Sequence, residues 1–533
     1  MPKLPWLLVV VALLGVLSLP GQAQTAPVPW SSEVYYEIFV RSFYDSDGDG
    51  IGDLQGIIEK LDYLNDGDPT TTDDLGVTGL WLMPINPSPS YHGYDVTDYY
   101  AINPDYGTLE DFRALLEAAH ARGMRVLIDL VINHTSRLHP WFVAAATDPN
   151  SPYREYYRFL DEVGPGGSRI WHANPAWGGY YLGIFWEGMP DLNYENPAVT
   201  EEIQAITRFW LEEVGVDGFR LDAIKHLVEE GRALENTPAT YAWMADYHDF
   251  VQSVAPEALL VGEAWSSTVN VVRYIGNGVD LAFEFDLALG MVGSANTGIR
   301  NSWNQAMQLV LDQYPPGQYA TFLTNHDQDR VMSVVREREG AAKVAATLLL
   351  TSPGVPFIYY GEEIGMVGRK PDPRLRTPMQ WDRTPITAGF TTANRPWEPL
   401  QEGIETRNVA TQDADPNSLL NYYRTLVHFR NAQPALQFGS LAPLETDSLR
   451  VIAYLRQWEG ETLLVLVNLD DEPLSDYALA LESGLAGPVE AVEVLFGEAG
   501  EASAPEVNAA GGFAGYRPLP ELPAQSGLVL KLE

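Results

Sequence analysis

The chain of 533 residues contains no cysteine, which excludes disulfide bonds, thiolate nucleophiles and thiolate metal ligands. It is also poor in basic residues, with 33 Lys and Arg against 72 Asp and Glu and a formal net charge of −39. Nucleic-acid binding requires clustered cations that neutralise phosphates, so this balance predicts no nucleic-acid partner. The acidity indicates a well-solvated surface, with adaptation to salt as the alternative.

The N-terminus also lacks an apolar run long enough for a membrane anchor. The N-terminal stretch Trp6–Leu19 is shorter than the roughly 20 residues of a transmembrane helix. Lys3 precedes it and the small-residue segment Gly21-Gln22-Ala23 follows it, so residues 1–23 are predicted to be a signal peptide cleaved near Ala23. A retained anchor is the alternative. Export without disulfides suits a secreted or periplasmic bacterial protein with no stable membrane anchor after cleavage.

From about residue 33 the chain alternates between strand-like and helix-like patterns. The expected strands are Glu33–Phe43, Thr78–Ile85, Met124–His134, Val216–Ala223, Ala258–Trp265, Leu281–Asp286, Tyr319–Asp327 and Val355–Tyr360. Among the expected helices are Leu54–Leu64, Leu109–Arg122, Val199–Val214 and Leu419–Asn431. Eight strand–helix repeats predict an α/β fold, a closed parallel (β/α)8 TIM barrel.

Two segments interrupt this alternation. Residues 135–197 are rich in Pro, Gly and aromatic residues and show no clear period, which predicts an irregular subdomain inserted after strand 3. Beyond about residue 437, short alternating runs such as Leu449–Arg456 and Thr462–Asn468 predict a C-terminal antiparallel β-sandwich. The expected organisation is a signal peptide at 1–23, the barrel at 24–134 and 198–436, the inserted subdomain at 135–197 and the β-sandwich at 437–533.

Ionisable residues stand at the ends of several expected strands, where a parallel barrel gathers its functional groups. The segments concerned are 129–134, 218–226, 262–265 and 324–327. Arg220 and Asp222 are two residues apart on a strand and share a face, so the guanidinium should lower the carboxyl pKa. Glu263, near Trp265, should be partly desolvated with a raised pKa. Two such carboxyls, about 5–5.5 Å apart, can cleave a glycosidic bond with retention.

In order and spacing, these four segments resemble the signature regions of the α-amylase superfamily of glycoside hydrolases, which act on α-glucosidic bonds. The resemblance implies that Asp222 is the nucleophile and Glu263 the acid/base, while Asp327 holds the distorted sugar. Asp129 would be a structural acid beneath the site. The implied substrate-binding residues are His92, Tyr94, Asp95, His134, Arg220, Lys225, His226 and His326.

An acidic loop after the first expected strand predicts a Ca²⁺ site, because hard cations prefer several oxygen ligands and glycines allow a tight turn. The expected ligands are Asp45, Asp47, Asp49, the Ile51 carbonyl and Asp53. Gly56 departs from the EF-hand pattern, and a metal-free acidic turn is the alternative. The resemblance implies a second calcium site that uses Asn133, Asp191 and the carbonyl of His226.

The motifs that bear on specificity point in two directions. His92-Gly93-Tyr94 resembles α-amylases, whereas Asp95 resembles α-glucosidases, in which this acid helps to bind a terminal glucose. Met189–Asn193 lies between groups, and Arg376–Asp382 resembles α-glucosidases and trehalose synthases. The chain thus resembles the intermediate α-amylase subfamily, which has mixed oligo-1,6-glucosidase and neopullulanase signatures.

Export favours an enzyme that acts on starch or its fragments outside the cell. We therefore expect a monomeric, calcium-dependent α-amylase that cleaves internal α-1,4 bonds of starch, glycogen and maltooligosaccharides. The alternatives are an exo-acting α-glucosidase or oligo-1,6-glucosidase, and a transglycosylating relative. A non-catalytic sugar-binding or transporter-subunit module would lack part of the acidic trio. Aromatic residues of the insertion are expected to divide between its core and the substrate groove: Trp171, Trp177, Tyr180, Tyr181, Phe185 and Trp186.

Overall fold

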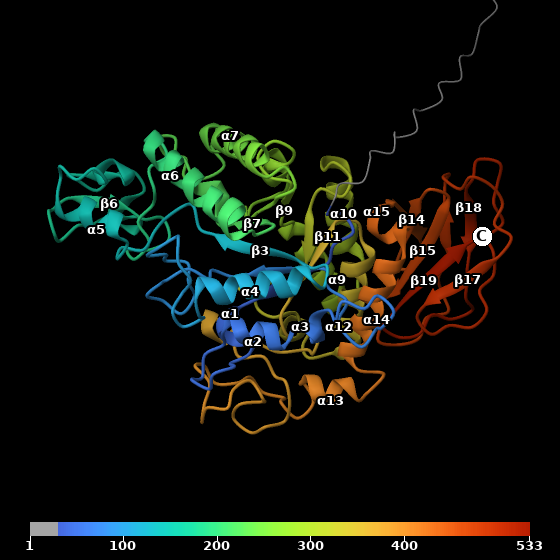
Figure 1. The fold of residues 1–533 in the computed structure, drawn as a ribbon. Coiled ribbons are helices and arrows are strands. Elements are labelled where there is room, and N and C mark those ends of the chain that lie inside the picture. The colour runs from blue at the N-terminus through green and yellow to red at the C-terminus, as the bar shows by residue number, and fades with distance from the viewer. Residues whose placement is uncertain (1–29) are drawn as a thin grey trace, which may run out of the picture.

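The structure is a computed structural model that describes residues 30–533, so the predicted signal peptide lies outside the described residues. Eight parallel strands form a barrel at the centre of the molecule (Figure 1). They are β1 (Tyr35–Ile38), β2 (Gly79–Leu82), β3 (Arg125–Leu130), β7 (Gly218–Leu221), β8 (Leu259–Gly262), β9 (Leu281–Ala282), β10 (Ala320–Phe322) and β11 (Val355–Tyr359). A parallel bridge between Phe283 and Ala320 joins the two ends of the sheet. The predicted (β/α)8 barrel is confirmed.

Two strands are shorter than the sequence predicted. Helix α1 (Val40–Phe43) replaces the second half of the expected strand Glu33–Phe43, because the chain bends there and Ser42 Oγ donates to the carbonyl of Arg376. Helix α9 (Phe285–Thr297) replaces the end of the expected strand Leu281–Asp286. An acid in the first turn of a helix is favoured by the helix dipole, so Asp286 suits this start.

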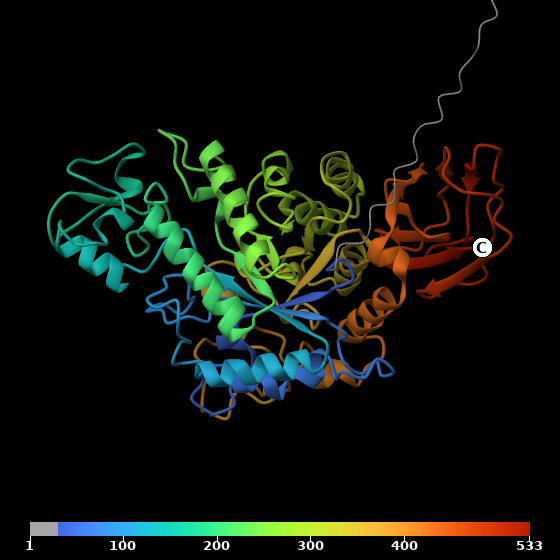
Figure 2. The ribbon, with the colours of Figure 1, turned by 45° about the horizontal axis from the view of Figure 1, so that its top comes forward.

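Helices surround the barrel (Figure 2). They include α2 (Leu54–Glu59), α3 (Leu61–Leu64), α4 (Leu109–His120), α6 (Pro197–Arg208), α7 (Pro238–Val254), α8 (Thr268–Val271), α10 (Asn301–Gln313), α11 (Val331–Val334), α12 (Glu339–Thr351), α13 (Val409–Asp413), α14 (Leu419–Ala432) and α15 (Pro434–Phe438). Helix α4 begins with a capping box between Thr108 and Asp111, which satisfies two backbone N–H groups. No helix within residues 30–533 has the length and apolarity needed to cross a bilayer.

The interior of the barrel is apolar along most of the strands and becomes polar at their carboxyl ends. Trp81 and Phe283 lie 5.2 Å apart, ring centre to ring centre, in a buried cluster of inward-facing side chains. At the carboxyl ends of the strands this cluster gives way to charged residues. Asp129 on β3 is paired in register with Arg220 on β7, so adjacent strands present opposite charges in one layer. That layer contains the candidate site.

The segment between β3 and α6 projects from one side of the barrel, at the left of Figure 1. It contains α5 (Pro140–Thr147) and a small antiparallel sheet of β4 (Phe159–Leu160), β5 (Trp171–Ala173) and β6 (Tyr180–Leu182). It is therefore more regular than expected. Trp171 and Tyr181 are buried, whereas Trp177, Phe185 and Trp186 are 59%, 47% and 44% exposed. The burial of Trp171 and Tyr181 agrees with the expected core members, and the place of the exposed rings in a substrate groove stays a prediction.

Two antiparallel sheets complete the fold and confirm the predicted sandwich. One contains β12 (Ser440–Pro443), β14 (Val451–Trp458), β15 (Glu461–Asn468), β17 (Val492–Phe496) and β19 (Ser526–Leu532), and the other contains β13 (Glu445–Thr446), β16 (Leu479–Leu481) and β18 (Phe513–Tyr516). A second core of buried Leu, Val, Tyr and Phe residues lies between them. The domain boundaries given above stay predictions.

Two buried arginines lie where the sandwich meets the barrel, and both donate to the carbonyl of Leu436. Arg430 on α14 donates to the carbonyls of Leu350 and Gly354 at 2.9 Å. Arg456 on β14 donates to the carbonyl of Thr351, at the end of α12, and to that of Leu436 at 2.9 Å. These guanidinium groups satisfy carbonyl oxygens that a helix end leaves without partners.

Candidate active site

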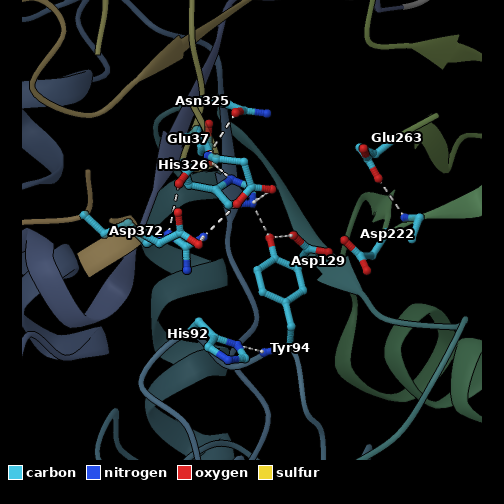
Figure 3. A network of polar contacts seen from close by, with 12 residues as sticks. Glu37, His92, Tyr94, Asp129, Asp222, Glu263, Asn325, His326 and Asp372 are labelled. Carbon is cyan, nitrogen blue, oxygen red and sulfur yellow. Dashed lines mark hydrogen bonds and ion pairs between the residues drawn. The ribbon is translucent and has the colours of Figure 1, made fainter. Parts of the chain in front are cut away.

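Arg220 is the centre of the charged layer at the mouth of the barrel. Three carboxyl groups that face it, those of Asp129, Asp222 and Glu263, are labelled in Figure 3. Its Nη1 lies 2.9 Å from both carboxylate oxygens of Asp129 and 2.7 Å from Asp222 Oδ1. Its Nη2 lies 3.8 Å from Glu263 Oε2, which also accepts the Ala223 N–H at 2.9 Å. Asp222 and Glu263, predicted from different signature segments, therefore face the same guanidinium.

The two carboxyl groups both have raised pKa values. Burial raises the pKa of Asp222 and outweighs the opposing charge of Arg220, so the expected lowering is wrong. Burial also raises the pKa of Glu263, as predicted, although Arg220 opposes it. Trp265, two residues further on, is 43% exposed and stacks on Phe285 at 4.8 Å. A raised pKa suits Glu263 as a general acid.

Asp327, which follows β10, has the opposite character. Burial would raise its pKa, but His326, Arg376 and Arg220 together lower the pKa to about 2. Arg376 Nη2 donates to Asp327 Oδ1 at 2.7 Å, and its Nε donates to the carbonyl of His326 at 3.0 Å. Asp327 is thus an ionised carboxylate held in place by a cation. The sequence places Arg376 in a motif but does not identify it as a site residue.

His326 and Tyr94 lie side by side between Asp327 and Asp129. The two rings are stacked with centres 5.5 Å apart, and His326 Nε2 lies 2.7 Å from Tyr94 Oη. Tyr94 Oη donates to Asp129 Oδ2 at 3.0 Å. On its other side, His326 Nδ1 lies 2.5 Å from Glu37 Oε1. Glu37 was not predicted, although a lone carboxylate in the apolar run 35–38 was a usable signal.

Another part of the site lies where the barrel meets the inserted segment. His134 Nε2 contacts the Tyr94 carbonyl at 3.2 Å, and burial lowers the pKa of His134 to about 4, so its ring is neutral. Phe185 touches both His134 and His226, with ring centres 5.2 Å and 5.6 Å apart. Lys225 Nζ donates to the Trp265 carbonyl at 2.8 Å. The insertion therefore places an exposed aromatic ring over two predicted substrate-binding histidines.

His92 and Asp95 stand beside Tyr94 but in different settings. The His92 ring is stacked with that of Tyr94 at 6.1 Å. Asp95 is 3% exposed, and its Oδ1 accepts hydrogen bonds from the hydroxyls of Ser88, at 2.7 Å, and Ser90. That oxygen is committed to its own loop, so the sugar-binding role of Asp95 stays a prediction.

The acidic loop brings together three of its five predicted metal ligands. Asp45, Asp47 and Asp49 offer carboxylate oxygens that all lie within 4.8 Å of one another. Asp53 has another task, because it caps α2 through the Gly56 N–H at 2.7 Å and accepts the Ser46 N–H at 2.8 Å. Three neighbouring carboxylates fit a hard cation, which Asp45, Asp47 and Asp49 would hold. Bound calcium would neutralise their mutual repulsion and fasten the loop.

The second predicted metal position also has oxygen donors. Asn133 Oδ1 is buried with no hydrogen-bond partner among the described residues, and its Nδ2 lies 3.4 Å from Asp191 Oδ1. Burial raises the pKa of Asp191 strongly, and Glu229 adds to this. An unpaired amide oxygen beside a buried carboxylate fits a cation held by Asn133 and Asp191. The carbonyl of His226 stays a predicted ligand; the His226 ring bonds the Leu234 carbonyl at 2.8 Å.

Comparison with known proteins gives a consistent result. Residues 37–439 match the family described as "Alpha amylase, catalytic domain". The chain is 40% identical to "Alpha-amylase 3" of Dictyoglomus thermophilum over 449 residues, which are 83% of this chain and 86% of that protein. It is 35% identical to "Trehalose synthase/amylase TreS" of Mycobacterium tuberculosis, covering 84% of this chain and 83% of that protein.

The fold leads to the same group of proteins. The crystal structure of the α-amylase from H. orenii superposes with a TM-score of 0.78 at 42% sequence identity. The match covers 94% of this chain and 99% of the other. The sequence and structural likenesses thus extend well beyond the four short segments of the site.

Proposed function

This chain belongs to the α-amylase family of glycoside hydrolases, and on that premise we propose that it is a retaining, endo-acting α-amylase. Its substrates would be starch, glycogen and maltooligosaccharides, cleaved at internal α-1,4 bonds. The observation that carries the proposal is the pair of carboxyls, Asp222 and Glu263, that face one guanidinium, 2.7 Å and 3.8 Å from its nitrogens. Their predicted spacing of about 5–5.5 Å is the one that a retaining mechanism requires.

The roles follow from the chemistry of each group. Asp222, ionised beside Arg220, attacks the anomeric carbon while Glu263 protonates the departing glycosidic oxygen, which leaves a glycosyl ester on Asp222. Glu263 then takes a proton from water, whose oxygen attacks the same carbon and restores both carboxyls. Asp327, with its low pKa, is a fixed negative charge near the positive charge that develops on the sugar ring.

Two features support cleavage inside a chain. Phe185 is 47% exposed and contacts His134 and His226, two predicted substrate-binding residues, so it offers a sugar an apolar ring beside them. Asp95, the acid typical of enzymes that bind a chain end, is buried and bonded to Ser88 and Ser90. Both observations favour the amylase over the α-glucosidase.

The exo-acting or transglycosylating alternative has its own support. Arg376 begins the motif that resembles α-glucosidases and trehalose synthases, and its guanidinium lies in the site against Asp327. The relative from Mycobacterium tuberculosis is named as both a synthase and an amylase. Loop shape, rather than the carboxyl trio, separates these activities.

Three further properties belong to the proposal. Calcium dependence is supported by the grouping of Asp45, Asp47 and Asp49. Export to the periplasm or medium, with cleavage near Ala23, is supported by the composition of residues 1–23. A monomer is the third property, carried over from the expectation given above.

A time course on soluble starch tests the function, with product sizes, product anomers and iodine staining followed together. An endo-acting retaining enzyme releases α-configured oligosaccharides of mixed length and destroys iodine staining early. Glucose as the only product, with slow loss of staining and cleavage of maltose, would move the assignment to an α-glucosidase. Products of β configuration would overturn the retaining mechanism.

A further inference from the structure

Glu37 is a buried carboxyl group that the mechanism above does not use. It lies on β1, paired in register with Trp81 on β2 and with Tyr359 on β11. Side chains alternate along a strand, so Glu37 points into the barrel as Tyr35 does. Glu37 is 2% exposed and His326 is 0% exposed, and Oε1 of Glu37 lies 2.5 Å from Nδ1 of His326.

This contact is the first in a line of hydrogen bonds that leads to the nucleophile. His326 Nε2 lies 2.7 Å from Tyr94 Oη, and Tyr94 Oη lies 3.0 Å from Asp129 Oδ2. Arg220 bonds Asp129 at 2.9 Å and Asp222 at 2.7 Å. Figure 3 shows Tyr94 between His326 and Asp129, with Glu37 behind the histidine. These buried hydrogen bonds connect His326 on one side of the site to Asp222 on the other.

The number of protons fixes the direction of these bonds. Burial raises the pKa of Asp129 to about 7, against the charge of Arg220. Arg220 Nη1 nevertheless donates to both oxygens of Asp129, an arrangement that favours the ionised carboxylate and hence an acceptor. Tyr94 has one hydroxyl proton and donates it to Asp129, so Tyr94 Oη must accept from His326 Nε2. Nε2 therefore carries a hydrogen. A neutral imidazole has only one N–H, which leaves Nδ1 as an acceptor that needs a donor.

The protonated carboxyl of Glu37 can supply that donor. Burial raises the pKa of Glu37 well above its ordinary value, although the charge of Arg220 opposes this. Burial lowers the pKa of His326 well below its ordinary value, although Asp327 opposes this. Both shifts favour a neutral pair over a buried ion pair, since isolating two charges from water is costly.

We propose that Glu37 is a positioning residue of the active site, which donates its carboxyl proton to His326 Nδ1 and thereby fixes Nε2 as the N–H that faces Tyr94 and Asp327. His326 Nε2 lies 3.4 Å from Asp327 Oδ2, so this N–H is directed at the transition-state-stabilising acid as well. The inference deepens the proposed function and rests on it. Without Glu37, the imidazole could reverse its tautomer, and the Tyr94 hydroxyl would then donate to His326 Nε2 instead of to Asp129.

Two substitutions test the role through activity. Glu37→Met keeps the length and volume but removes the donor, and we expect kcat/KM on maltooligosaccharides to fall about 100-fold, mainly through kcat. Glu37→Gln keeps a donor, because its amide N–H can bond Nδ1, and should stay within roughly tenfold of the parent. Parent-like activity of Glu37→Met, or equal losses in both variants, would overturn the proposal. Melting temperatures would show that both variants are folded.

A matched control separates this role from the loss of any buried carboxyl. Glu362 is fully buried and accepts the Tyr423 hydroxyl at 2.8 Å. We expect Glu362→Gln to keep kcat/KM within about twofold of the parent, since Glu362 has no place in the line described above. A loss as large as that of Glu37→Met would mean that the effect is general, and would overturn a specific role for Glu37.

A spectroscopic measurement is independent of turnover. Nitrogen-15 NMR of histidine-labelled protein should show the His326 ring neutral, with Nε2 protonated and Nδ1 bare, from about pH 6 to pH 8. A sample with His326→Gln assigns the signal among the nine histidines. A ring with Nδ1 protonated and Nε2 unprotonated would mean that His326 donates to Glu37 and accepts from Tyr94. That result would overturn the proposal. A parent enzyme without α-glucan hydrolysis would overturn the proposed function alone.

Discussion

Arg220 on β7 donates a hydrogen bond from Nη1 to Oδ1 of Asp222, two residues further along the chain, at 2.7 Å. The alternation of side chains along a strand places both on one face, and the barrel turns that face toward its mouth. The same guanidinium faces Asp129 on β3 and Glu263 after β8. One cation on one strand therefore organises three carboxyl groups, and it remains charged at any pH at which the protein is folded.

The nucleophile can be removed without changing the shape of the site. Asp222→Asn should lower kcat on starch at least about 1,000-fold, because an amide cannot form the glycosyl ester. Asp217→Asn is a matched control at the other end of the same strand, where Asp217 accepts the Val126 N–H at 2.7 Å. We expect the control to keep its activity. An Asp222→Asn enzyme within tenfold of the parent would exclude Asp222 as the nucleophile.

The exposed ring over the site should determine how strongly oligosaccharides bind. Phe185→Ala removes the face that contacts His134 and His226, and we expect KM for maltooligosaccharides to rise about tenfold with a smaller change in kcat. Trp177→Ala, at an exposed ring of the same inserted segment, provides the comparison. Equal KM values for the parent and Phe185→Ala would remove Phe185 from the substrate groove.

Calcium removal should weaken the fold through the acidic loop. Without a cation, Asp45, Asp47 and Asp49 would repel one another, so a chelator should lower the melting temperature by about 5 °C or more. Asp49→Asn should reduce this shift, whereas Asp68→Asn, in another acidic turn of the chain, should not. Identical melting curves with and without a chelator would argue against a structural calcium ion.

The buried carboxyl of Glu362 should make stability depend on pH. Burial raises the pKa of Glu362 to about 8, so the folded state keeps a proton that the unfolded chain releases near its ordinary pKa. The contribution to stability is present below the unfolded pKa and is lost as pH rises through the folded pKa. At about 1.4 kcal/mol for each pKa unit, the loss amounts to a few kcal/mol.

Glu362→Gln removes this titration. Urea unfolding between about pH 5 and pH 9 should therefore show a smaller decline in the free energy of unfolding for the variant than for the parent. Glu235→Gln is a suitable comparison, because the side chain of Glu235 is half exposed and pairs with Lys225, and this substitution should not remove the decline. Parallel pH profiles for the parent and Glu362→Gln would mean that Glu362 is ionised in the folded state.

The sequence was informative wherever local pattern and chemistry coincide. The eight repeats predicted the barrel, and Arg220 with Asp222 could be assigned to one face from their spacing alone. Element ends were less predictable, because an apolar run such as 281–286 suits both a strand and the start of a helix. The barrel needs only two of those residues as strand β9, and α9 takes the last two.

The contacts that complete the site could not be read from spacing. Glu37 meets His326 across 289 residues of sequence, and Arg376 reaches Asp327 from 49 residues away. The predicted direction of the Asp222 pKa shift was wrong for a related reason. The sequence reveals the neighbouring guanidinium, but it does not reveal how completely the surrounding chain excludes water from the carboxyl.

The buried Arg456 of the C-terminal sandwich has a consequence for how such proteins can be recombined. It donates to Gly439 close by, but also to the backbone of barrel helix α12 and to Leu436. Exchanging the sandwich for that of another family member would leave these carbonyls without donors unless an arginine stood at the same place. The division between the two parts, so clear in Figure 1, is therefore a poor position for a crossover in chimeric enzymes, and the two are best inherited together.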